Sequence, residues 1–130
     1  RTEMTDALVA ADLLVGRAGS STLAEASALG LPMVVVPYPH ASAHQVANAR
    51  ALADAGAAQI VPDDELDAGK LIDASGLLAR PADLAVMRDA ARGFGRPGAA
   101  GAVADLVMAL AQRRPLPSAD AIDLTSRAAA

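Results

Sequence analysis

The sequence predicts an α/β fold built on a parallel sheet, and two observations support this class. Three short apolar runs, at residues 12–16, 33–36 and 58–61, have the length and hydrophobicity of strands buried on both faces. Segments with helical periodicity separate them and are long enough to connect parallel strands. Ligands of such sheets bind outside the carboxyl ends of the strands, so the loops after the first two strands are the expected functional region.

The helices are predicted at residues 5–11, 21–29, 43–55, 64–78, 81–92 and 98–112. Gly30 and Pro32 end the second of them, and Gly56 ends the third. Glycine and proline at residues 93–97 separate the last two. Residues 113–130 are polar, rich in alanine and without periodicity, and we expect them to form a disordered tail after a partial domain at residues 1–112.

The composition is that of one modest domain and excludes several classes of protein. The chain has 130 residues, a net charge of -4 and no cysteine. The acidic balance argues against nucleic acid as a partner, because phosphate binding needs clustered Lys and Arg. The lack of cysteine excludes thiol chemistry and fits a reducing cytoplasm. No apolar run reaches the roughly 18 residues of a membrane-spanning helix. The chain begins on helix-like sequence at Arg1, and we expect it to be part of something longer.

The first loop offers small residues at the start of a helix. Gly19, Ser20, Ser21 and Thr22 precede Leu23, Ala24 and Glu25. Two interpretations fit: the free N–H groups of the helix N-terminus bind an anion, or Thr22 and Glu25 form a capping box. Glu25 likewise has two candidate roles, as a capping residue or as a carboxylate that grips the hydroxyls of a ribose.

The second loop, at residues 37–44, leads into a helix with two amides on one face. Gln45 and Asn48 lie one turn apart, so they suit sugar hydroxyls or simply form a solvated helix start. His40 and His44 have no carboxylate or third ligand nearby in sequence, so a metal site is not expected. The acidic residues at 62–67 are expected to form a loop and a helix N-terminus.

Taken together, these motifs resemble the C-terminal domain of the MurG family of bacterial cell-wall glycosyltransferases. The resemblance rests on RAGSSTLAE, ALGLP, VPYP, HQVANA and AGAA in this order and spacing, with GRPGAAGAVADLV near the end, and it covers roughly residues 3–112. It implies a Rossmann-like parallel sheet, the C-terminal domain of the two-domain GT-B fold, that is incomplete in this chain.

The resemblance also implies a function. The family transfers N-acetylglucosamine from UDP-GlcNAc to a lipid-linked muramoyl-pentapeptide in peptidoglycan synthesis. It works on the cytoplasmic face of the cell membrane, with inversion and without a metal or other cofactor. Carried over by position, the residues from Ser20 to Glu25 would hold the diphosphate and, through Glu25, the ribose. Gln45 would contact the GlcNAc hydroxyls, with Gly19, His44 and Asn48 as neighbours.

The chain departs from the family pattern in two ways. Ala43 stands where many relatives carry a polar residue. The acceptor-binding N-terminal domain, the proposed catalytic base and the first strands of the donor domain are absent, so the chain alone is not expected to catalyse transfer. The alternatives are another GT-B transferase, a separate nucleotide-sugar-binding subunit that needs a partner, or a non-enzymatic binding module or remnant.

Overall fold

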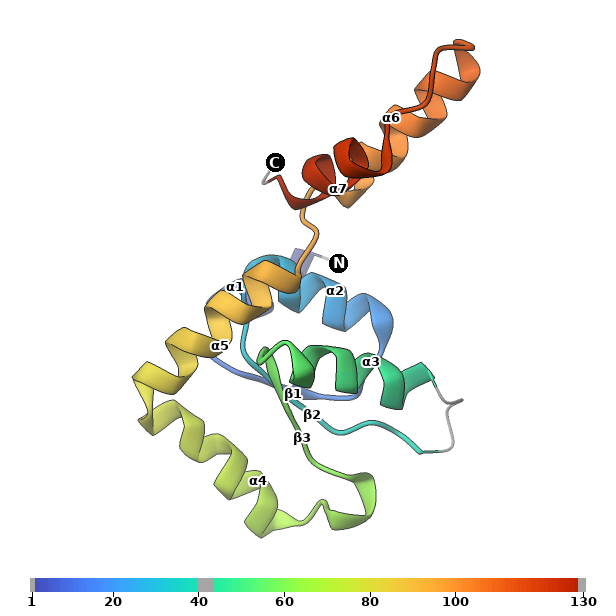
Figure 1. The fold of residues 1–130 in the computed structure, drawn as a ribbon. Helices are drawn as coiled ribbons and strands as arrows, with labels where there is room; N and C mark the ends of the chain where they lie inside the picture. Colours follow the sequence, from blue (N-terminus) through green and yellow to red (C-terminus); the bar gives the residue numbers. More distant parts are fainter. Residues whose placement is uncertain (1, 40–43, 129–130) are drawn as a thin grey trace. The chain divides into compact units, whose positions relative to one another are not determined.

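The computed structural model describes residues 2–39 and 44–128 and divides into two compact units, Arg1–Gly95 and Arg96–Ala130. Unit 1 alternates helices and strands in the predicted order (Figure 1). Its elements are α1 (Thr2–Ala10), β1 (Leu14–Gly16), α2 (Ser20–Leu29), β2 (Met33–Val35), α3 (His44–Asp54), β3 (Ala58–Ile60), the 3-10 turn η1 (Asp63–Glu65), α4 (Ala68–Ser75), the 3-10 turn η2 (Gly76–Ala79) and α5 (Pro81–Phe94).

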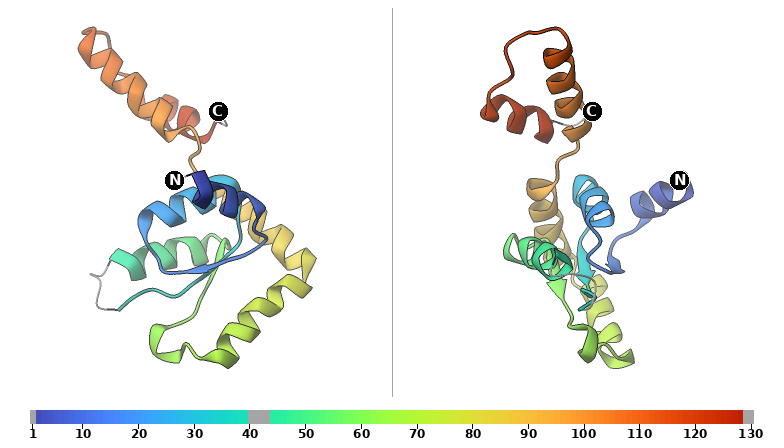
Figure 2. Two further views of the ribbon diagram at one scale, coloured as in Figure 1. Left: turned by 180° about the vertical axis from the view of Figure 1, so that it is seen from behind. Right: turned by 90° about the vertical axis from the view of Figure 1, so that its right-hand side faces the viewer.

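The three strands form one parallel sheet in the order β1-β2-β3. Leu14 lies opposite Met33, which lies opposite Ala58. The predicted α/β class with a parallel sheet is therefore confirmed. Figure 2 shows the connecting helices α2 and α3 beside the strands from two further directions.

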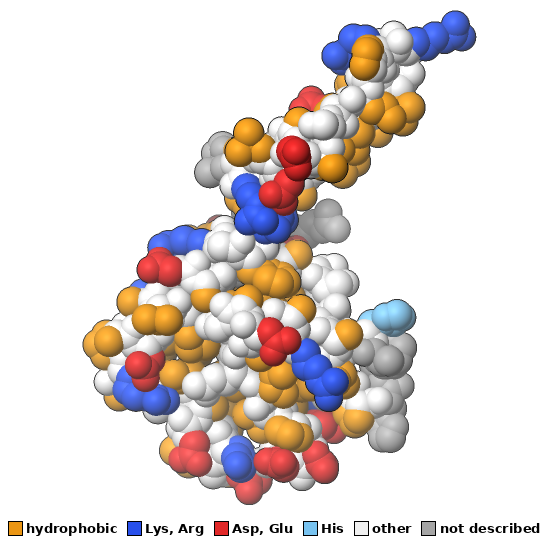
Figure 3. All heavy atoms as spheres, viewed as in Figure 1, with side chains coloured by type: hydrophobic (Ala, Val, Ile, Leu, Met, Phe, Trp, Pro, Cys, Tyr) orange, Lys and Arg blue, Asp and Glu red, His pale blue; other side chains and the backbone are white. Residues whose placement is uncertain are grey.

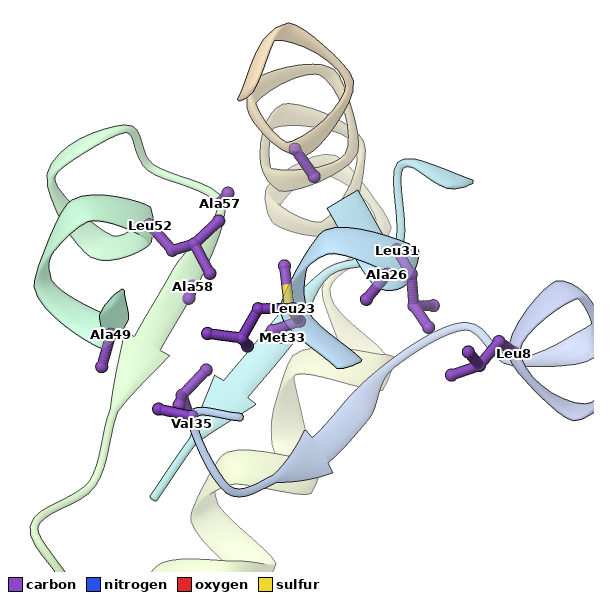
Figure 4. Close-up of a cluster of buried hydrophobic side chains, with 12 residues drawn as sticks. Leu8, Leu23, Ala26, Leu31, Met33, Val35, Ala49, Leu52, Ala57 and Ala58 are labelled. Carbon is purple, nitrogen blue, oxygen red and sulfur yellow. The ribbon is translucent and has the colours of Figure 1, made fainter. Parts of the chain in front are cut away.

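The central strand is buried on both faces, as its continuous apolar sequence predicts. Met33 and Val35 point toward Leu23 of α2 and Leu52 of α3 (Figure 4). Val34 points to the other face, where it packs with Ala74, Leu77, Leu84 and Met87 from α4, η2 and α5. The core thus has two layers, one on each side of a sheet only three strands wide.

Helix ends in unit 1 follow local chemistry. Gly30 and Gly56 adopt φ angles of 69° and 80°, a left-handed conformation that glycine adopts without strain, and they follow α2 and α3 as predicted. The single helix expected at residues 64–78 is wrong. Asp67 accepts a hydrogen bond of 2.7 Å from the N–H of Lys70 and caps α4, so the helix begins at Ala68 and 3-10 turns flank it.

Gly95 marks a close approach between the end of α5 and α2. A Cβ atom placed on Gly95 would lie 2.5 Å from the carbonyl oxygen of Ser27 and 2.9 Å from the Cα of Ala28. Both atoms belong to backbone and cannot move aside as a flexible side chain would. Gly93 lies two residues earlier, and a Cβ atom placed on it would meet nothing within 4 Å. The two glycines therefore carry different constraints.

Unit 2 consists of two helices, α6 (Ala99–Ala111) and α7 (Ala119–Arg127). The structure differs here from the disordered tail expected at residues 113–130. The Oγ of Ser118 accepts a hydrogen bond of 3.2 Å from the N–H of Ala121 and caps α7. A hydrogen bond from Arg127, together with the charges of Arg127 and Arg96, lowers the pKa of Asp123 below its ordinary value. A short polar sequence forms a helix here because its cap and its charge pairs are local.

Apolar side chains are exposed along α6 (Figure 3), and they include Val103, Val107, Met108 and Leu110. The sequence of this helix is apolar on most sides, and only Ala102 and Ala109 are buried. In the part of the chain that the structure describes, no helix is long and apolar enough to cross a membrane.

We predict that Gly95→Ala destabilises unit 1 by about 1–3 kcal/mol, because the added methyl group overpacks against the α2 backbone. The matched variant Gly93→Ala should be neutral or stabilising by up to about 1 kcal/mol, since alanine is the better helix former. Chemical denaturation followed by circular dichroism measures both. Equal stabilities of the two variants would show that the close approach carries no constraint.

Candidate functional site

The carboxyl ends of the three strands meet at one edge of the sheet. The pairing of the backbone continues one residue beyond the strands: the N–H of Val36 donates to Gly16 over 2.8 Å, and the N–H of Val61 donates to Val35 over 3.0 Å. The two predicted loops therefore leave the sheet side by side. Within the second loop, His40 and Ala43 lie outside the described residues.

The first loop leads into α2, and no side chain caps this helix at its N-terminus. Gly19 is the N-cap residue, and no side-chain hydrogen bond caps the helix there. The first helical bond joins the N–H of Leu23 to the oxygen of Gly19 over 3.0 Å. The N–H groups of Ser20, Ser21 and Thr22 precede this bond and are the unpaired donors at the positive end of the helix dipole. Such donors bind a phosphate or another anion.

The capping box expected from Thr22 and Glu25 is wrong. Thr22 is the third residue of α2, whereas a capping box needs this residue at the N-cap, with an extended backbone. The helix begins three residues earlier than that motif requires, because the turn after β1 is only three residues long. Neither side chain is therefore needed to complete the helix N-terminus.

Instead, Ser21, Thr22 and Glu25 are exposed on α2. Glu25 follows Thr22 by three residues and Ser21 by four, so it shares a face of the helix with both. Glu25 lies about 5–6 Å further along the helix axis than the two hydroxyl residues. It also lines a hollow of about 210 Å³ between α1 and α2, whose other walls come from Thr5, Leu8, Ala28 and Leu29. A carboxylate at the mouth of a mostly apolar hollow suits a ligand with both hydroxyls and an apolar part.

The amides of α3 are tied to the two loops. The Oε1 of Gln45 accepts a hydrogen bond of 3.0 Å from the N–H of Tyr38, and the Nδ2 of Asn48 donates to Ala18 over 3.4 Å. Both residues are half-buried, and each has one polar atom bonded to the backbone of a neighbouring loop. Within residues 2–39 and 44–128, the Nε2 of Gln45 has no protein partner and is available to donate to a ligand.

Asn48 also reaches the start of α2. A second hollow, of about 150 Å³, lies between α2 and α3, and Phe94 closes one side of it. Its walls are formed by Ser20, Leu23, Ala24, Asn48, Ala51, Leu52 and Phe94. The fold thus brings Ser20 and Asn48 together, while Leu23 is buried beneath them and Glu25 faces the other hollow.

His44 is exposed at the first turn of α3. In the described part of the chain, no group of three or more His, Asp or Glu side chains gathers as metal ligands would.

Sequence reasoning missed three residues at this edge: Arg17, Tyr38 and Asp63. The guanidinium of Arg17 forms an ion pair with Asp63, lies 5.3 Å from the ring centroid of Tyr38 and donates to the carbonyl of Val36 over 3.4 Å. One common signal marks them, because each follows a different strand by no more than three residues. Arg17 and Asp63, however, lie 46 residues apart in the sequence, so no local sequence pattern indicates their contact.

The chain matches known proteins over most of its length. A family model described as "Glycosyltransferase family 28 C-terminal domain" matches residues 1–103. A protein of Moorella thermoacetica named "UDP-N-acetylglucosamine--N-acetylmuramyl-(pentapeptide) pyrophosphoryl-undecaprenol N-acetylglucosamine transferase" is 50% identical over 107 residues, which cover 81% of this chain and 29% of the relative. The Agrobacterium fabrum protein of the same name is 44% identical over 114 residues, 86% of this chain and 30% of the relative.

A solved structure agrees with these sequence matches. The crystal structure of Acinetobacter baumannii MurG superposes with a TM-score of 0.71 at 37% sequence identity, over 81% of this chain and 32% of that one. The chain spans about 30% of the length of the curated relatives that it matches.

We predict that Thr22→Ala and Glu25→Ala change the free energy of unfolding by less than about 0.5 kcal/mol, because neither side chain caps α2. Asp67→Ala is the matched control in the same unit: it removes a cap that is present in the structure and should cost about 1 kcal/mol. Urea denaturation of the three variants makes the comparison. A loss for Thr22→Ala as large as that for Asp67→Ala would restore the capping role.

Proposed function

The chain belongs to the family of glycosyltransferase family 28 C-terminal domains, and from this premise we propose that it forms the donor-binding portion of an N-acetylglucosaminyltransferase of peptidoglycan synthesis. The single observation that carries the proposal is the exposed face of α2. There, an uncapped helix N-terminus and the carboxylate of Glu25 stand one turn apart. The names of the relatives supply the substrate class, since they describe transfer of N-acetylglucosamine to a pyrophosphoryl-undecaprenol acceptor.

The N-terminus of α2 binds the diphosphate of the donor in this proposal. The free N–H groups of Ser20, Ser21 and Thr22 donate to phosphate oxygens, and the small side chains of this turn let the phosphates approach the backbone. When the bond between the sugar and the diphosphate breaks, negative charge develops on the leaving UDP. Donors that already point at this position stabilise the charge without further reorganisation, which is the share of catalysis that this chain contributes.

Glu25 binds the ribose of the donor. Its carboxylate accepts hydrogen bonds from the two neighbouring hydroxyls, and the hollow beside it between α1 and α2 receives the apolar part of the nucleoside. The exposure of Glu25 and its lack of a capping role support this assignment, since the carboxylate is open to a ligand.

Gln45 binds the sugar. Its Oε1 is held by Tyr38, so its Nε2 is the group that donates to an oxygen of N-acetylglucosamine. Asn48 and His44 stand on the same turn of α3 as neighbours of this contact. In the proposed enzyme the acceptor site and the general base lie outside these 130 residues. We therefore expect the chain alone to bind donor without transferring sugar, and the complete enzyme to act on the cytoplasmic face of the cell membrane.

We predict that Glu25→Ala weakens binding of UDP-GlcNAc and of UDP alike. The loss of two charge-assisted hydrogen bonds costs roughly 2–4 kcal/mol, or about 30- to 1000-fold in affinity. Isothermal titration calorimetry on the protein made from its complete reading frame measures both ligands. Glu25→Gln should lose less, because it keeps one acceptor, and Asp105→Ala removes an exposed carboxylate of α6 as a control for charge. Unchanged affinity for Glu25→Ala would exclude the ribose contact.

We predict that Gln45→Ala weakens UDP-GlcNAc by about tenfold and UDP by no more than about twofold, because the amide reaches only the sugar. The same titrations give the ratio of the two affinities. An equal loss for both ligands would move Gln45 away from the sugar end of the donor.

A further inference from the structure

One residue from each of the three loops meets at the carboxyl edge of the sheet. Arg17 follows β1, Tyr38 follows β2 and Asp63 follows β3. The guanidinium of Arg17 pairs with Asp63, lies over the ring of Tyr38 and donates to the carbonyl of Val36. The side chain of Arg17 is 50% exposed and that of Asp63 27%, so the pair is only partly shielded from water. A single side chain thus connects all three loops.

Beyond the sheet, side chains link these loops. The backbone pairing ends at Gly16, the last residue of β1, and at Val36 and Val61, one residue past β2 and β3. Further out, Arg17 joins the first loop to the second and third, and Asn48 joins α3 to Ala18. Arg17 therefore contributes two contacts to the loop after β2, one to the carbonyl of Val36 and one to the ring of Tyr38.

Arg17 is also connected to the residues that bind the donor in the proposed function. On one side, two residues of main chain separate Arg17 from Ser20, the first residue of α2. On the other side, the ring beneath the guanidinium belongs to Tyr38, whose N–H holds the Oε1 of Gln45. The guanidinium of Arg17 thus links the turn before α2 to the loop that contacts Gln45, beside the hydrogen bond from Asn48 to Ala18.

Arginine suits this position better than lysine. Its planar group can lie over an aromatic ring and still donate in its own plane to a carboxylate and a carbonyl. An ammonium group is a compact point charge and cannot combine stacking with two fixed donors in this way.

We propose that Arg17 is a positioning residue, which holds the loop after β2, and with it Gln45, in register with the N-terminus of α2. This role rests on the proposed function, because the register matters only if one ligand reaches both places. Arg17 directs its guanidinium to Asp63, Tyr38 and Val36, and it acts on the donor through Gln45.

Calorimetric titration of UDP and UDP-GlcNAc into the protein made from its complete reading frame tests the role. Arg17→Gln should weaken UDP-GlcNAc by about tenfold and UDP by at most about twofold, because the register of the sugar contact is lost while α2 remains. Asp63→Asn and Arg17→Lys should show smaller losses of the same kind. Tyr38→Phe keeps the ring and should bind UDP-GlcNAc more tightly than Tyr38→Leu.

Two controls separate positioning from a general loss of structure. Arg80→Gln removes another half-exposed arginine, whose partner Asp83 lies 3.2 Å away on α5, and should leave both affinities unchanged. The double variant Arg17→Gln with Gln45→Ala should lose no more affinity for UDP-GlcNAc than Gln45→Ala alone, because both substitutions act on one contact.

The outcomes are distinct. If Arg17→Gln weakens UDP as much as UDP-GlcNAc, Arg17 contacts the diphosphate directly or supports the whole fold, and the positioning role is overturned. Additive losses in the double variant, or unchanged affinities for Arg17→Gln and Asp63→Asn, overturn it as well. If the unmodified protein binds neither ligand, the proposed function fails, and the positioning role fails with it.

Discussion

Burial of β2 on both faces is the constraint on which the rest of unit 1 depends. Met33, Val34 and Val35 are each no more than 1% exposed, and burying three such side chains contributes roughly 5–8 kcal/mol before entropy is counted. This is a large fraction of the roughly 5–15 kcal/mol by which a whole domain is stable. Helices cover both faces of β2, and because the strands are parallel the chain crosses over after β1 and after β2. The crossovers bring the loops after β1, β2 and β3 to a single edge.

The chemistry at this edge depends on the hydrogen-bonding groups that those loops and helices leave available to a ligand. Glycine at the N-cap of α2 leaves the helix without a side-chain cap, so backbone donors remain for a ligand. Gln45 and Asn48 of α3 each use one polar atom of the side-chain amide to bond the backbone of a neighbouring loop. The other polar atom of each amide is available to a ligand. The edge therefore combines fixed geometry with open hydrogen-bonding capacity, and a binding site needs both.

Patterns that act over short range were predictable from the sequence. Continuous apolar runs predicted the three strands, and Gly30 and Gly56 predicted the ends of α2 and α3, because each depends on neighbouring residues alone. The motifs around Ser20 and Gln45 likewise indicated the edge where the candidate site lies. The capping box failed because a shift of three residues in the start of a helix changes the role of every residue in its first turn. Arg17 and Asp63 were missed because their pairing depends on strand order, which no local pattern encodes. The helix α7 was missed because, beside its serine cap, it packs against α6, and no local pattern encodes that packing.

Gly19 has an unexpected position in this fold. Its φ and ψ of -69° and 129° suit any residue, and a Cβ atom would meet nothing within 4 Å, so neither strain nor crowding requires glycine there. Serine or aspartate would fit and would stabilise α2 as a cap, by about a few tenths of a kcal/mol relative to glycine. The same oxygen would occupy the N–H groups that an anion needs, and a carboxylate would repel the anion as well. Selection for thermal stability and selection for ligand affinity therefore favour different residues at this position, and glycine is the residue that leaves the helix end open.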